Sequence, residues 1–394
     1  MSRYTVIETP LNVHAVDELI SATLRGEDVS WCGNNGAAFA ETVLERCDYH
    51  GVGALLNEQL QNRGGWPAFV LDALHSRALA QTMWELRHQH VLGGLLAALT
   101  KCGIHPVIFK GTALAYSHYA NPALRARGDT DVIVGPQERS RAADVLTSQG
   151  FELSTGVTCV EFIIYQASYK RDCAGNGEHH IDLHWRINNY EVLSQLFSYE
   201  DLRSKAEPLP RLCTDALAAG PVHALLVACM HRAVHMQSPY YVNGAACYGG
   251  DRLIWLYDIH LLARGSTHAQ WQEFLDEAQQ KGLRSVCREG LERARTHLHT
   301  NIPDFVLASL EEAGTQERVS TYLNGSKLRR TRMDFRAIRG ARNKLRFLGE
   351  LALPPAAYMR SIYPDLRQSG LPWLYVRRTA GGLMKYLRMS QQTP

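Results

Sequence analysis

The sequence lacks a strong excess of charge of either sign. Its 394 residues include 42 basic and 39 acidic side chains, which gives a formal net charge of +3. No overall electrostatic attraction to nucleic acid follows from this balance, so any binding of a polyanion must be local. With 45% hydrophobic residues, the chain can still bury a substantial core.

Long apolar runs are also missing. The longest, such as residues 224–229, fall well short of the roughly 20 residues that cross a bilayer. The first residues lack the basic stretch, apolar run and small-residue cleavage site of a secretory signal. We therefore expect a folded, cytoplasmic protein with no membrane partner.

Paired cysteines are absent from the sequence. The nine cysteines are scattered singly and form no C-x-x-C pair, whereas soft-metal sites normally show clustered ligand pairs. This pattern is typical of reduced, mostly structural thiols, and we expect no zinc–thiolate site.

The hydropathy pattern changes character along the chain. Residues 67–101 repeat apolar side chains at three- and four-residue intervals, which predicts one or two amphipathic helices. β-Branched runs at 107–109 and 132–134, separated by helix-favouring stretches, predict a strand–helix–strand–helix series. Residues 160–170 and 179–187 predict two more strands, joined by a loop that contains glycine.

Beyond Pro210, several segments carry an apolar stripe at the helical period, which predicts a helical bundle. The whole pattern indicates an α+β fold, in which a small mixed sheet with helices is flanked by N-terminal helices and a C-terminal bundle. We expect an N-terminal helical region at 1–100, a catalytic core at 101–205 and a C-terminal helical domain at 206–394.

Three aspartates form the most informative pattern. Asp129 and Asp131 flank one threonine and lead into a Val-Ile-Val run, so both side chains should project from the same face of a strand. Asp182 alternates with the apolar Ile181 and Leu183, so it should point away from the core. Magnesium prefers carboxylate oxygens and leaves its other positions to water and phosphate oxygens. The three acids predict a site for Mg²⁺ or Mn²⁺, with two ions suiting in-line displacement at phosphorus.

Lys110, Gly111 and Thr112 close the first strand and open a helix. The glycine lets a phosphate approach the backbone, the helix start offers free N–H groups, and Lys110 and the Thr112 hydroxyl could bind phosphate oxygens. An ordinary strand-to-helix turn is the alternative. Arg125 and Arg127, just before the aspartates, could neutralise charge on a triphosphate or be ordinary surface arginines.

The order of these parts resembles the DNA polymerase β-like nucleotidyltransferase superfamily, which has a Gly-Ser or similar pair, then Asp-x-Asp, then a later carboxylate. More narrowly, residues 107–134 and 181–187 are similar to a bacterial family of uncharacterised nucleotidyltransferases, and weaker similarities extend from about residue 50 to 390. The resemblance implies the nucleotidyltransferase fold, a metal site at the three aspartates, and triphosphate contacts at Gly111 and Thr112.

Three more side chains should share the face of Asp182. His180 and His184 could each act as general base, although metal-held carboxylates can also serve. A single-ion site made of His180, Asp182 and His184 is not expected, because alternate residues on one strand are roughly 6.6 Å apart. Arg186 suits a structural salt bridge as well as it suits a substrate contact.

Later features leave their roles open. His231 and His235, four residues apart on an expected helix, could bind zinc or simply pack. Asp258 could close over the nucleotide from the C-terminal domain. The basic segment 327–346 could be a solvated helix face or a surface for a phosphate-bearing ligand or RNA.

Our leading hypothesis is transfer of a nucleoside monophosphate from an NTP, such as ATP, to an unidentified acceptor, with release of pyrophosphate. The near-neutral charge favours a small molecule, peptide or protein as acceptor over long nucleic acid, while an RNA end stays possible. One alternative is a glycosyltransferase that uses Asp129-Thr130-Asp131 to bind a sugar nucleotide. The other is a non-catalytic nucleotide-binding module.

Overall fold

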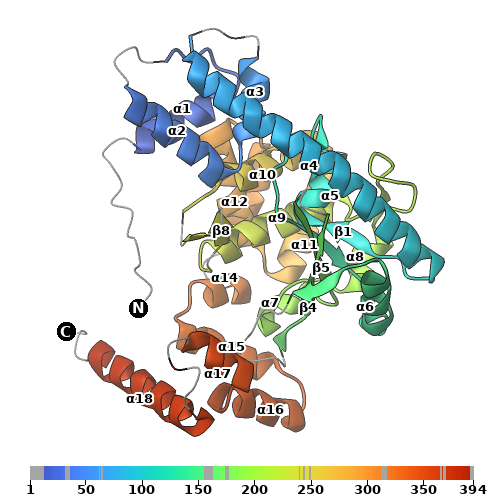
Figure 1. Ribbon diagram of the computed structural model, residues 1–394, viewed down its shortest axis with the longest axis vertical. Coiled ribbons are helices and arrows are strands. Elements are labelled where there is room, and N and C mark those ends of the chain that lie inside the picture. The colour runs from blue at the N-terminus through green and yellow to red at the C-terminus, as the bar shows by residue number, and fades with distance from the viewer. Residues whose placement is uncertain are drawn as a thin grey trace.

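The computed structural model contains a seven-stranded mixed sheet (Figure 1). The structure describes residues 13–31, 36–61, 63, 65–154, 163–173, 177–238, 240–242, 245–247, 250–311, 317–363, 366 and 370–390. The strand order is β3-β4-β5-β2-β1-β7-β6. The strands are β1 (Val107–Phe109), β2 (Asp129–Ile133), β3 (Glu152–Ser154), β4 (Gln166–Asp172), β5 (Glu178–His184), β6 (Glu207–Pro208) and β7 (Leu217–Ala218).

The middle of the sheet contains both strand directions. β2 runs antiparallel to β1 and parallel to β5, and β4 runs antiparallel to β5. Helices α5 (Lys110–Ser117) and α6 (Arg139–Ser148) follow β1 and β2, which confirms the expected strand–helix–strand–helix series. The strand expected from residue 160 begins at Gln166 instead, and residues 160–162 lie outside the described part of the chain.

Alternation along the strands divides the sheet between two apolar cores. Ile108 and Val132 belong to the core shared with α6 and the second half of α4. Phe109 and Ile133 belong to the larger core, which joins the N-terminal helices to helices that follow the sheet. The sheet therefore has a helix-covered back, formed by α4 and α6, and a front that faces the C-terminal helices.

The N-terminal region is helical, as expected. It contains α1 (Val13–Leu24), α2 (Ala37–His50), α3 (Gly53–Leu60) and α4 (Ala68–Lys101). The apolar repeat at 67–101 forms one continuous helix of 34 residues, α4, which runs along the molecule in Figure 1. A helix of this length can carry side chains from the N-terminal core to the back of the sheet.

Apart from β6 and β7, the chain after β5 is mainly helical, which confirms the α+β fold. Its elements are α7 (Glu191–Ser194), α8 (Tyr199–Ser204), α9 (Pro221–His235), β8 (Tyr240–Val242), β9 (Ala245–Cys247), α10 (Leu253–Gly265), α11 (His268–Lys281), α12 (Arg284–Leu298), α13 (Asp304–Glu311), α14 (Arg318–Leu323), α15 (Lys327–Ala337), α16 (Ala341–Ala352), α17 (Ala356–Ile362) and α18 (Leu371–Ser390). The division into domains at residues 100 and 205 stays a prediction, and the sheet itself extends to Ala218 in β7.

Two further sequence predictions concern the described residues. None of the helices there is both long enough and apolar enough to cross a bilayer. The seven described cysteines are free thiols, while Cys32 and Cys159 lie outside the described residues.

Candidate active site

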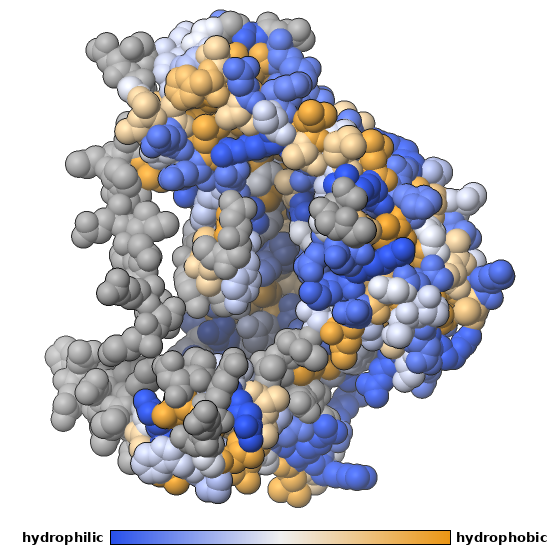
Figure 2. Space-filling model, in the orientation of Figure 1, coloured by the Kyte–Doolittle hydropathy of each residue, from blue (hydrophilic) through white to orange (hydrophobic). Residues whose placement is uncertain are grey.

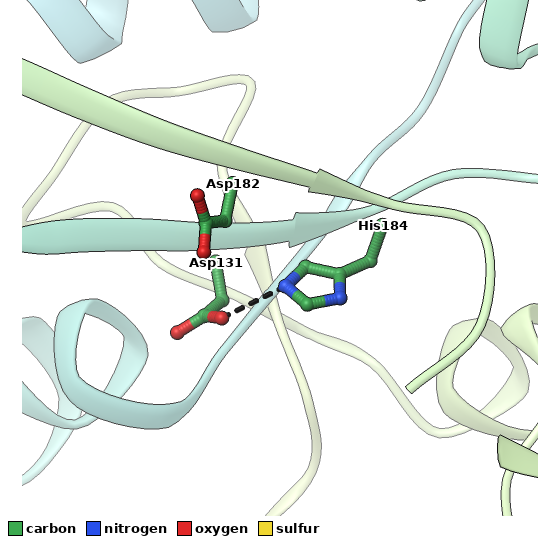
Figure 3. A group of neighbouring side chains, drawn as sticks. All are labelled: Asp131, Asp182 and His184. Carbon is green, nitrogen blue, oxygen red and sulfur yellow. Dashed lines mark hydrogen bonds and ion pairs between the residues drawn. The ribbon is translucent and has the colours of Figure 1, made fainter. Parts of the chain in front are cut away.

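Asp131 and Asp182 stand opposite each other on the parallel strands β2 and β5. A carboxylate oxygen of each, together with a ring nitrogen of His184, lies within 4.8 Å of the other two (Figure 3). Asp129 lies on the same strand face, two residues before Asp131. The predicted projection of the three aspartates from one sheet face is therefore confirmed by the strand register.

The strand alternation also explains what lies behind this cluster. Ile181 and Leu183 are almost fully buried in the rear core, as their apolar pattern predicts. Thr130, between the two aspartates of β2, is also buried. Because successive side chains point to opposite faces, the acids are left on the front of the sheet while the apolar residues hold the strands from behind.

Lys110 supplies a positive charge to the cluster. Its ammonium group donates to Oδ1 of Asp131 at 2.6 Å, from a residue whose φ of 59° places it in the left-handed region. Burial opposes a charged lysine, but the neighbouring Asp131, Asp129 and Asp182 raise the pKa of Lys110 above its ordinary value. The sequence suggested Lys110 as a phosphate ligand, whereas in this structure its contact is a carboxylate.

His184 is the second partner of Asp131. Its Nε2 lies 2.9 Å from Oδ1 of Asp131, and the side chain is almost fully buried beside the Phe109 ring. Burial alone would raise the pKa of Asp131, but the charge of Lys110 and the hydrogen bond from His184 hold it well below its usual range. Sequence reasoning placed His184 on the correct face and missed its link to Asp131, because the strand pairing was unknown.

Asp129 differs from its neighbours in having no fixed partner. Within the described part of the chain, its carboxylate makes no hydrogen bond or ion pair, and solvent reaches the residue. Its pKa is raised to about 7, first by the loss of hydration among surrounding protein atoms and then by the negative charges of Asp131 and Asp182. The cluster thus holds more negative charge than Lys110 alone offsets.

Asp182 is oriented by a short chain of amide groups. Gln166 on β4 donates from Nε2 to Oδ2 of Asp182 at 2.9 Å, and Asn189 donates to Oε1 of Gln166 at 3.0 Å. These bonds fix one carboxylate oxygen of Asp182 and leave the other available. No sequence signal distinguished Gln166, because an exposed-looking glutamine at a strand start has no motif.

The donor set fits a hard divalent cation. Carboxylate oxygens from Asp129, Asp131 and Asp182 are the ligands that Mg²⁺ prefers, and an imidazole such as His184 is also acceptable to Mn²⁺. The raised pKa of Asp129 is the electrostatic sign of a cluster that a further positive charge would stabilise. These four side chains are the ones that could hold the metal.

Thr112 lies at the start of α5 and contacts the back of β2. Its hydroxyl lies 2.8 Å from that of Thr130 and accepts from Nε of Arg127 at 2.9 Å. Thr130 in turn lies 2.7 Å from Nε2 of His88 on α4. The Thr112 hydroxyl is therefore engaged inside the protein, whereas the backbone at the start of α5 lacks a side-chain cap, since Phe109 precedes it.

The two arginines before β2 are buried anchors instead of surface residues. Arg125 forms a two-pronged ion pair with Asp258 of α10, at 2.7 Å and 2.8 Å. Its guanidinium covers Gly111 so closely that a Cβ built there would lie 3.4 Å away. Arg127 pairs with Glu85 of α4 at 2.7 Å. Asp258, which the sequence offered as a residue that could close over a nucleotide, binds Arg125 in this structure.

The remaining predicted residues lie at the edges of the cluster. His180 is partly exposed and pairs with Glu178 at 3.3 Å. Arg186 lies beyond the end of β5, 3.4 Å from Glu191 and over the Tyr165 ring, so the salt-bridge alternative describes its contact.

The histidine pair on α9 is part of an aromatic cluster. The rings of His231 and His235 meet edge to face, with centroids 4.5 Å apart, and both pack against Trp255. Among the described residues, the grouping of at least three metal-ligand side chains is Asp131, Asp182 and His184, and the α9 pair is not part of it. Packing is the role that these contacts support.

Comparison with known proteins agrees with this geometry. The model of a family described as uncharacterised nucleotidyltransferase matches residues 38–299, about two thirds of the chain, including every residue of the acidic cluster. None of the curated proteins matches the chain. The chain therefore belongs to the uncharacterised nucleotidyltransferase family and is a nucleotidyltransferase enzyme.

Proposed function

We propose that this enzyme transfers a nucleoside monophosphate from an NTP to an acceptor and releases pyrophosphate, with Mg²⁺ or Mn²⁺ held by Asp129, Asp131 and Asp182. The observation that carries the proposal is the opposed pair Asp131 and Asp182, with Asp129, which has no partner among the described residues, on the same strand face. When bound, the metal would supply charge neutralisation for the triphosphate and its leaving group.

The start of α5 is the proposed binding site for the triphosphate. Its first N–H groups have no side-chain cap, and the absence of a side chain at Gly111 lets the Arg125 guanidinium pack against the turn. Arg125 is itself neutralised by Asp258. Its role in this proposal is to shape the turn, and the backbone amides of Gly111 and Thr112 bind phosphate oxygens.

The proton of the acceptor is assigned to a carboxylate of the cluster. His184 is fixed on Asp131 and His180 on Glu178, so neither imidazole is positioned as the base. The Asp129 carboxylate and Oδ1 of Asp182 are the oxygens that can still accept a proton from the acceptor. The proposed acceptor is a small molecule, a peptide or a protein.

Direct detection of the transferred group would test the proposal. The purified chain is incubated with each NTP, Mg²⁺ and a bacterial cell extract, and products are analysed by mass spectrometry. The Asp131→Asn and Asp182→Asn variants are compared with Asp172→Asn, an exposed acid at the end of β4. We expect one nucleoside monophosphate on an extract component with wild type and Asp172→Asn, and none with the other two.

Three other outcomes have different meanings. Release of UDP from a sugar nucleotide would replace the proposal by glycosyl transfer. Nucleotide binding without transfer to any extract component would favour a non-catalytic module. Equal transfer by Asp131→Asn and wild type would contradict the assigned metal site.

A further inference from the structure

Helix α16 exposes an apolar stripe that no described part of the chain covers. Leu345 is 70% exposed and Leu348 is 46% exposed, and Leu353, just after the helix, is 66% exposed. Residues three apart share a helix face, so Leu345 and Leu348 form one stripe. Phe347 on the opposite side is buried near Phe335 of α15. The helix therefore has one apolar face for folding and a second that faces solvent.

Helix α18 carries a second exposed apolar pair. Trp373 and Val376, three residues apart, are each 57% exposed. The Tyr375 hydroxyl donates to the Pro354 carbonyl at 2.6 Å, so the first half of α18 is held against the end of α16. We define the α16–α18 patch as the exposed apolar side chains Leu345, Leu348, Leu353, Trp373 and Val376.

Basic side chains accompany these apolar residues. Residues 327–346 contain nine basic residues and one acid, Asp334. Asp334 is buried, where it accepts from the Tyr322 hydroxyl and the Val192 backbone, so it does not balance the surface charge. Figure 2 shows hydrophobic and hydrophilic residues side by side at the lower end of the molecule, where Figure 1 places α15, α16 and α17.

We propose that the α16–α18 patch docks this enzyme on the surface of an anionic lipid bilayer, in contrast to the expectation from the sequence that it has no membrane partner. An exposed apolar stripe flanked by arginine and lysine, with an exposed tryptophan on a neighbouring helix, is the composition of helices that lie in the membrane interface. Such a helix places its apolar side chains at the acyl boundary and its basic side chains among anionic headgroups. The helices lie on the bilayer and do not span it, which agrees with their amphipathic pattern.

Other occupants fit the patch less well. A second copy of the chain would bring two surfaces of the same strong positive charge together. RNA would bind the arginines through its phosphates, but Leu345 and Leu348 would stay in contact with water and phosphate. The patch also lies outside residues 38–299, which the family model matches, so this docking is independent of the proposed transfer chemistry.

Vesicle flotation with the full chain tests the proposal. We expect the protein to float with vesicles of phosphatidylcholine mixed with phosphatidylglycerol, not with phosphatidylcholine alone, and less at high salt. Leu345→Ser/Leu348→Ser, which leaves every charge in place, should weaken binding by at least about tenfold. The matched control is Leu86→Ser/Leu153→Ser, at residues 58% and 56% exposed on α4 and β3, which should bind like wild type.

A second variant, Arg339→Gln/Arg342→Gln, tests the contribution of charge. Both arginines are exposed beside the stripe, and their replacement should also weaken binding to the vesicles. Circular dichroism confirms that each variant is folded. Absence of flotation with anionic vesicles, or equal flotation by the Leu345/Leu348 variant and wild type, would overturn the proposal. Added RNA could also displace the protein from vesicles to the same extent in wild type, Leu345→Ser/Leu348→Ser and Leu86→Ser/Leu153→Ser. That result would indicate a surface that binds through charge alone and would overturn the proposal.

Discussion

The Lys110 ammonium lies 2.6 Å from Oδ1 of Asp131, on the same oxygen that His184 approaches at 2.9 Å. One carboxylate therefore receives two positive or hydrogen-bonding partners, while Asp129, on the same strand face, receives none among the described residues. This unequal distribution of partners between Asp131 and Asp129 sets the charge state of the acidic cluster before any ligand binds.

Replacing Lys110 should destabilise the metal-free protein more than the metal-bound one. In Lys110→Met, the cluster loses its internal cation, and we expect a loss of about 2 kcal/mol in the presence of EDTA. Added Mg²⁺ should recover most of that loss, because it supplies the missing charge. Thermal unfolding with EDTA and with Mg²⁺ measures the difference.

The control for this variant is Lys205→Met, which removes an exposed lysine that pairs with Glu273 and should change stability little in either condition. An equal loss for Lys110→Met with and without Mg²⁺ would show that Lys110 does not compensate the metal site.

Arg127 and Glu85 should behave as a coupled buried pair. Both side chains are at most 5% exposed, and the pair also binds the Thr112 and Tyr116 hydroxyls. Arg127→Met or Glu85→Gln alone should cost about 3–5 kcal/mol, because each leaves a buried polar partner behind. The double variant should lose clearly less than the sum of the single losses, as urea unfolding would measure. Additive losses would contradict the coupling.

Thr130 should be a structural contact between α4 and β2. Thr130→Val keeps the shape but removes the hydroxyl that meets His88 and Thr112, and we expect a loss of about 1–3 kcal/mol. Thr147→Val, which removes an exposed hydroxyl bonded to its own helix, serves as the matched control and should cost under about 0.5 kcal/mol. Equal stability of the two variants would show that the buried network is not stabilising.

The contribution of Asp129 to the stability of the metal-free protein should fall as pH rises from about 4 to 7. The pKa of Asp129 is raised from 3.8 to about 7 in the folded chain, so the folded state binds more protons than the unfolded state in this range. Stability decreases with pH wherever that holds, and the effect should end above pH 7. Unfolding of wild type and Asp129→Asn in EDTA, compared from pH 4 to 8, isolates the contribution, which should be absent in the variant.

Which face the three aspartates occupy could be predicted from the sequence, because strand alternation is a local property. The spacing of Asp129 and Asp131, and the apolar neighbours of Asp182, already placed these acids on one face of two strands. The glycine at residue 111 likewise marked the turn into α5. Periodicity also predicted α4 and the helices after Pro210, since apolar stripes report directly on the helical repeat.

The partners of the arginines were beyond the reach of local patterns. Arg127 pairs with Glu85, 42 residues away, and Arg125 pairs with Asp258, 133 residues away. Neither acid sits in a motif. For this reason the sequence suggested triphosphate contacts for two guanidinium groups that the fold uses to hold α4 and α10 against the turn between β1 and α5.

The sequence by itself determined which residues could form a metal-binding face, because side-chain direction along a strand depends only on parity. Only the tertiary structure decided that β2 pairs in parallel with β5, so that Asp131 meets Asp182 and His184 joins them. It also decided which charges are already neutralised, because ion pairing depends on distances between segments that the chain brings together only on folding.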